Sequence, residues 1–163
     1  ARAMRQAGNR VISIMGARSK NLVFWEEELG QVSDQLIVTT DDGSYGRKGL
    51  VTEPLRELLS GDGKISRVIA IGPSVMMKFC AKTTEPFGVK TIVSLNPIMV
   101  DGTGMCGGCR VAVSGATRFA CIDGPDFDGH QVDWDLLLAR QRIYLDEEKH
   151  SLEQCQIQHG THS

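Results

Sequence analysis

Short apolar runs alternate with amphipathic stretches through the first 95 residues of the chain. Four runs are rich in β-branched residues and end at glycine, proline or polar clusters, which is typical of buried strands in a parallel sheet. They span residues 10–15, 35–39, 67–71 and 89–95. Three stretches between them carry apolar residues at helical spacing. They span residues 21–30, 52–59 with Thr52 as the expected N-cap, and 74–84. This alternation predicts an α/β fold built on an open parallel sheet with right-handed crossovers.

The pattern changes after residue 97. Residues 110–114 and 117–121 read as two short strands around Gly115-Ala116, which predicts a hairpin. Asp133 precedes an amphipathic stretch and is the expected N-cap of a last helix. The polar tail from about residue 149 carries three of the four histidines and is expected to be frayed.

Composition narrows the class of protein. The chain has 163 residues and a net charge of −2, so no basic surface points to nucleic acid. It has no apolar run of 18 residues and no signal segment, which argues against a membrane protein. Five cysteines, an odd number with three of them clustered, argue against a secreted disulfide framework and favour a reducing, cytoplasmic setting. Cys80 is expected to be buried and Cys155 to be exposed.

The cysteine cluster is the most informative motif. Asp101, Cys106, Cys109 and Cys121 lie in a glycine-rich stretch with spacings of five, three and twelve positions. Thiolates are soft, negative ligands for iron, and glycines allow a backbone to turn tightly around them. The spacing resembles the plant-type iron–sulfur pattern C-x4-C-x2-C…C, with Asp101 at the first ligand position. The motif therefore predicts a [2Fe-2S] cluster and single-electron transfer.

Two other uses of these cysteines are weaker. A structural zinc site would share the Cys-x2-Cys loop, but it usually has a second ligand pair, and here His130 is the nearest histidine. A thioredoxin-like dithiol should open a helix, whereas residues 110–114 read as a strand.

Small and polar residues follow three of the predicted strands. Because ligands of open α/β sheets bind beyond the carboxyl ends of the strands, these loops are the predicted nucleotide site. Arg18 could stack on an adenine or pair with a phosphate, the carboxylates suit ribose hydroxyls, and Gly72-Pro73 would let a flat ring approach. Each loop is also compatible with an ordinary surface turn. The predicted cofactor-binding residues are Gly16, Ala17, Arg18, Thr39, Asp41, Asp42, Gly43, Ser44, Gly46, Gly72, Pro73 and Met76.

The loops and the cysteine motif together resemble the ferredoxin–NADP reductase superfamily, and within it the electron-transfer subunits with a C-terminal [2Fe-2S] segment. The nearest branches are those of the NADH-dependent reduced ferredoxin:NADP oxidoreductase small subunit and the archaeal cytoplasmic hydrogenase diaphorase subunit. The electron-transfer subunit of dihydroorotate dehydrogenase, with four cysteine ligands, is more distant. The resemblance rests on residues 11–19, 38–49, 69–73, 94–110 and 119–128.

The resemblance implies a domain order. Residues 1–97 would be a partial NAD(P)-binding domain, residues 98–150 the cluster-binding segment with its closing helix, and residues 151–163 a polar tail. The FAD domain of the family, and the first strand and glycine turn of its nucleotide domain, have no counterpart in the sequence. The chain is accordingly expected to be a fragment, inactive alone, whose uncovered sheet edge pairs with a second copy in a homodimer.

The resemblance also implies a function. The intact protein would transfer hydride between NAD(P) and FAD and pass single electrons through the cluster to a larger oxidoreductase subunit. These cofactors carry the chemistry, so no catalytic side chain is expected. The alternative is a non-catalytic module, stabilised by zinc or by the cluster, that docks a larger oxidoreductase subunit.

Overall fold

Parallel pairing of two strands organises the first part of the chain. In the computed structural model, which describes residues 1–159, β1 (Ile12–Ala17) pairs with β2 (Gln35–Thr40) from Ile12↔Gln35 to Ala17↔Thr40. A short parallel strand, β3 (Arg47–Lys48), extends this sheet in the order β1-β2-β3. Because the strands are parallel, the loops after β1 and β2 leave the sheet at the same edge.

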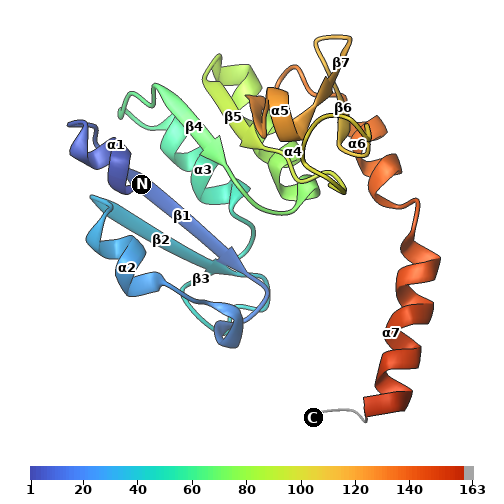
Figure 1. Ribbon diagram of the computed structural model, residues 1–163. Helices are drawn as coiled ribbons and strands as arrows, with labels where there is room; N and C mark the ends of the chain where they lie inside the picture. The colour runs from blue at the N-terminus through green and yellow to red at the C-terminus, as the bar shows by residue number, and fades with distance from the viewer. Residues whose placement is uncertain (160–163) are drawn as a thin grey trace. The chain divides into compact units, whose positions relative to one another are not determined.

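Short helices accompany this sheet. Residues 1–68 and 79–90 form one compact unit of the structure. Its helices are α1 (Arg2–Gln6), η1 (Lys20–Leu22), α2 (Glu26–Gln31), α3 (Thr52–Ser60) and η2 (Glu85–Phe87) (Figure 1). The interior of the unit includes Leu55 on α3 and the nearly inaccessible Thr40 on β2.

Two predicted features of this unit are wrong. The expected helix over residues 21–30 is divided into η1 and α2, because Trp25 takes the left-handed conformation with φ 57°. Thr52 is the first residue of α3 and does not cap it; the N-cap residue is Val51, with no side-chain cap hydrogen bond.

The second unit comprises residues 69–78 and 91–163. Its sheet has the order β4 (Arg67–Ala70), β5 (Lys90–Ser94), β8 (Asp126–Asp128), and β8 runs antiparallel to β5. Helix α4 (Ser74–Thr84) matches its predicted bounds and contributes its first five residues to this unit. The strands β3 and β8 were not predicted, since each is too short for an apolar pattern.

A hairpin follows β5. Strands β6 (Arg110–Val113) and β7 (Ala116–Phe119) pair antiparallel from Arg110↔Phe119 to Val113↔Ala116. The turn residues are Ser114 and Gly115, both with positive φ, and not Gly115-Ala116 as predicted. The second strand also ends earlier than expected, because Ala120–Asp123 form the short helix α5. Cys121 is therefore helical.

Two helices close the described chain. Asp133 caps α6 (Trp134–Gln141) as predicted, its carboxylate accepting a hydrogen bond from the Leu136 N–H. Leu137 packs this helix into the unit with 1 % of its surface exposed. The tail is not frayed as predicted, because α7 (Leu145–His159) continues through it. Three acidic residues in its first turn complement the helix dipole. The last four residues of the predicted tail, including His162, lie outside the described residues.

The α/β class is therefore confirmed, with the strands of residues 1–159 divided among two three-stranded sheets and one hairpin. No helix within this described range is long and apolar enough to cross a membrane.

Candidate functional site

A tight glycine-rich loop joins β5 to β6 and carries the first two predicted ligands. Gly102, Gly104 and Gly107 all have φ between +66° and +82°, a region that side chains with a Cβ rarely adopt. At Gly104 a Cβ would also lie 2.5 Å from the Cδ1 atom of Ile122, on α5. The loop thus sits directly against the helix that carries Cys121.

The carboxylate of Asp101 holds this loop in shape. Its two oxygens accept hydrogen bonds from the backbone N–H of Thr103 at 2.9 Å and of Cys106 at 3.2 Å. These hydrogen bonds, that from Thr103 foremost, lower the pKa of Asp101, so the side chain is an anion at neutral pH. An anionic oxygen donor is thereby fixed beside the Cys106 backbone.

Cys109 and Cys121 are brought together by the hairpin. Their Sγ atoms lie 3.2 Å apart, and the Ala120 N–H donates to the Cys109 carbonyl at 3.1 Å, which continues the β6–β7 pairing. Burial raises the pKa of Cys109, but hydrogen bonds from Cys121 outweigh it and lower that pKa overall. The same contact raises the pKa of Cys121, so one proton is shared between two thiols that approach each other closely.

Cys106 is exposed and accepts a hydrogen bond from the Gly108 N–H at 3.4 Å. The structure thus pairs Cys109 with Cys121 by their side chains, and joins Asp101 to Cys106 through the backbone. Within residues 1–159 no three or more His, Cys, Asp or Glu side chains converge closely enough to hold a metal ion as they stand.

The donor set nevertheless fits an iron–sulfur cluster. Three thiols and one ionised carboxylate come from one loop, one strand edge and one short helix, and a backbone N–H already points at a sulfur. These are the ligand types and the hydrogen bonding that iron–sulfur sites use. His130, considered for a zinc site, instead lies 3.7 Å from the Asp128 carboxylate. The structure gives it no contact with the cysteines.

The nucleotide residues predicted after β1 and β2 adjoin one another in the first unit. The Asp41 N–H donates to the Ala17 carbonyl at 3.1 Å, and the Asp42 N–H donates to the Arg18 carbonyl at 3.2 Å. Farther along the same loops, the Lys20 N–H donates to Ser44 Oγ at 2.8 Å. The Arg18 side chain is exposed at this edge.

The loop after β2 is built for close backbone approach. Gly43 and Gly46 have φ of +77° and +59°, and a Cβ at Gly46 would collide with the Val38 carbonyl. Asp42 accepts the Ser44 N–H, and hydrogen bonding by Ser44 lowers the pKa of Asp42. Thr39 does not face the edge: it is 1 % exposed and donates to the Met15 carbonyl.

Glycine also sets the spacing after β1. A Cβ at Gly16 would collide with Val51. Gly72, Pro73 and Met76 belong to the second unit, at the start of α4. There a Cβ at Gly72 would lie 2.5 Å from the Met76 Cε atom.

Two contacts at the first edge were missed. The Lys20 ammonium lies 5.3 Å from the centre of the Tyr45 ring, and the Tyr45 hydroxyl donates to Glu26 at 3.0 Å. That hydrogen bond raises the pKa of Tyr45. Neither pairing has a sequence signal, because the partners are about twenty residues apart and meet only through the sheet.

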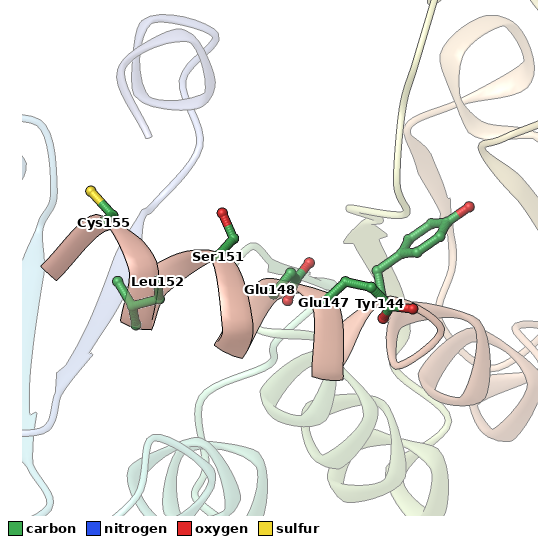
Figure 2. A pocket seen from close by; sticks show the side chains of 6 residues that line it. All are labelled: Tyr144, Glu147, Glu148, Ser151, Leu152 and Cys155. Atoms are coloured by element: carbon green, nitrogen blue, oxygen red, sulfur yellow. The ribbon is translucent and has the colours of Figure 1, made fainter. Parts of the chain in front are cut away.

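A surface hollow lies elsewhere, along α7. Figure 2 shows its six lining residues, all from Tyr144 or the helix that follows: Tyr144, Glu147, Glu148, Ser151, Leu152 and Cys155. It contains none of the predicted ligands or nucleotide residues. Cys155 is exposed here, and Cys80 is buried, as expected for both.

Comparison with known proteins defines the class of the cysteine-rich segment. Residues 96–133 match the family model described as the iron–sulfur cluster binding domain of dihydroorotate dehydrogenase B. The range contains all four predicted ligands. The resemblance to electron-transfer subunits with an iron–sulfur segment is thus confirmed.

Particular relatives match most of the chain. A Thermotoga maritima protein, named as a homolog of the dihydroorotate dehydrogenase B (NAD(+)) electron transfer subunit, is 51% identical over 94% of this chain and 54% of its own length. A Methanocaldococcus jannaschii protein, named as a probable subunit of that kind, is 35% identical over 77% of this chain and 47% of its own.

A solved structure gives the same result. It comes from a study of flavin-based electron bifurcation by the NADH-dependent reduced ferredoxin–NADP oxidoreductase. Its chain matches with a TM-score of 0.83 and 50% identity, over 93% of this chain and 54% of that one. The present chain thus spans about half the length of the relatives it matches.

Proposed function

We propose that Asp101, Cys106, Cys109 and Cys121 hold a [2Fe-2S] cluster and that the intact protein uses it to transfer electrons between a nicotinamide nucleotide and a larger oxidoreductase subunit. The observation that carries this proposal is the position of the four donors within 96–133, the segment that matches an iron–sulfur cluster binding domain. When bound, the cluster supplies a one-electron carrier.

The residues of the chain have separate tasks in this proposal. Cys109 and Cys121 are held as a pair by the hairpin and α5, and Asp101 and Cys106 as a pair by the loop. The Gly108 N–H stabilises negative charge on Cys106. Asp101 replaces a thiolate by a harder donor, so the potential should differ from that of a site with four cysteines.

The nucleotide would be NAD(H) or NADP(H), bound along the loops after β1 and β2. Arg18 would contact a phosphate or stack on the adenine, and Asp41 and Asp42 would accept hydrogen bonds from ribose hydroxyls. Gly72 and Pro73 would let the nicotinamide ring approach the backbone. FAD in the intact protein is a further proposal, supported by the relative studied for flavin-based electron bifurcation.

A ligand substitution tests the cluster assignment. Anaerobic reconstitution of Cys109→Ser should remove the visible absorption band and the reduced-state EPR signal that the unaltered protein develops. Cys155→Ser is the matched control, since Cys155 is an exposed thiol on α7, and it should reconstitute fully. Equal cluster content in Cys109→Ser and the control would contradict the assignment.

A further inference from the structure

Helix α6 is fixed at both ends within the second unit. At its start, Lys78 Nζ lies 2.6 Å from a carboxylate oxygen of Asp135. At its end, Gln141 Nε2 donates to the Asn96 carbonyl at 2.9 Å, and the Asn96 side chain accepts the Ser74 hydroxyl at 2.8 Å. With Leu137 buried between these ends, the helix forms a rigid platform.

One side chain of this platform reaches the ligand loop. The half-buried Arg140 donates from Nη2 to the Gly108 carbonyl at 3.3 Å. Gly108 lies between Cys106 and Cys109 in the sequence. Arg110 approaches the same turn, since its Nη1 atom lies 3.6 Å from where a Cβ on Gly107 would stand. Two guanidinium groups therefore flank the Cys-Gly-Gly-Cys turn.

We propose that Arg140 is a positioning residue of the cluster loop, one that orients the Gly108–Cys109 peptide and whose positive charge raises the reduction potential of the bound cluster. This inference rests on the proposed function. The interaction of Arg140 with the loop is unrelated to the ligand motif, because it comes from a helix more than thirty residues further along the chain.

The orienting effect follows from peptide geometry. The peptide group is planar, so holding the Gly108 carbonyl fixes the direction of the Cys109 N–H as well. The Cys109 amide would otherwise be free to rotate with its glycine neighbour, since glycine restricts its backbone little. Arg140 thus reduces the conformational freedom of the turn that joins two ligands.

The effect on potential follows from charge. Three thiolates and a carboxylate give the ligand set a negative charge, which reduction makes more negative. A cation near the loop stabilises the reduced state more than the oxidised state. Arg140 is a guanidinium, which stays protonated throughout the accessible pH range.

The test compares three variants of the full chain after anaerobic reconstitution, with the midpoint potential measured by EPR-monitored titration. Arg140→Met should lower the potential, and Arg140→Lys, which keeps the charge, should lower it less. Arg142→Met removes the same charge from an exposed position at the end of the same helix and should leave the potential unchanged. Equal potentials for Arg140→Met and Arg142→Met would overturn the proposed charge effect.

A second readout needs no cluster. In the metal-free proteins, hydrogen exchange of the Cys109 amide should be faster in both Arg140 variants than in Arg142→Met. Unchanged exchange would overturn the positioning role, even if Arg140→Met alone failed to fold. A failure of the unaltered protein to bind a cluster would instead contradict the proposed function, so the two failures are distinguishable.

Discussion

At the scale of single residues, the account depends on how each cysteine is surrounded. Cys109 and Cys121 share a proton, Cys106 receives a backbone hydrogen bond, and Cys155 faces solvent. Cys80 is different, because burial alone raises the pKa of its thiol to about 11. The four environments should have distinct reactivities, since the thiolate is the nucleophile.

Cys80 should resist alkylation in the folded protein. An ordinary thiol has a pKa near 8.5, so at pH 8 Cys80 should hold roughly a hundredfold less thiolate than Cys155 and should also be sterically shielded. Iodoacetamide labelling followed by peptide mass spectrometry should show rapid modification of Cys155 and little of Cys80. In urea the two rates should converge; equal rates in the folded protein would show that Cys80 is accessible.

The same burial makes stability depend on alkaline pH. Above about pH 8.5 Cys80 ionises in the unfolded chain but stays protonated in the folded one up to about pH 11. The unfolded state then binds fewer protons, so the free energy of unfolding should fall as pH rises through this range. In Cys80→Ala that dependence should be reduced.

At the scale of elements, α6 is the most informative. Its N-cap, Asp133, accepts the Leu136 N–H at 2.9 Å, and the helix carries Arg140 toward the ligand loop. Asp133→Ala should lower the free energy of unfolding by about 1 kcal/mol, the usual cost of removing a cap. Urea denaturation would measure this. Asp133→Asn is the matched control and should be close to the unaltered protein, because Asn caps equally well.

The elements show which parts of the fold the sequence could predict. The bounds of α4 and the cap of α6 were predicted correctly, because both depend on nearby residues. The helix expected over 21–30 is divided at Trp25, and its segment is tied by Lys20 and Glu26 to the loop after β2. Such contacts between distant segments override local periodicity and have no local signature.

The same distinction applies to the candidate site. The ligand motif is contiguous enough to be read from spacing, and all four of its residues fall in the matched iron–sulfur segment. Arg140 could not be predicted, because its contact with Gly108 joins residues 32 positions apart. Thr39 was expected to contact a nucleotide but is buried, since pattern alone does not tell on which face a strand's last residues lie.

At the scale of the whole molecule, the candidate nucleotide and cluster residues depend on different parts of the structure. Arg18 and the Asp41–Gly46 loop belong to the first unit, and all four cluster donors belong to the second. Substitutions in one set should therefore leave the other function intact.

Arg18→Ala should weaken nicotinamide nucleotide binding by about tenfold or more, since a charge-assisted hydrogen bond contributes roughly 1.5–3 kcal/mol. The intact protein, with the flavin expected of it, is the material for calorimetry. Lys64→Ala, an exposed cation in the same unit, should bind as the unaltered protein does. If Arg18→Ala bound the nucleotide unchanged, the first edge would not be the phosphate or adenine site.

The central claim is that the four donors hold an iron–sulfur cluster. The most direct measurement is quantification of metal and acid-labile sulfide in protein reconstituted anaerobically with iron, sulfide and zinc present together. The account predicts two irons and two sulfides per chain, little zinc, and an EPR signal from one unpaired electron after reduction. Stoichiometric zinc without sulfide, or iron without an EPR-active reduced state, would contradict it.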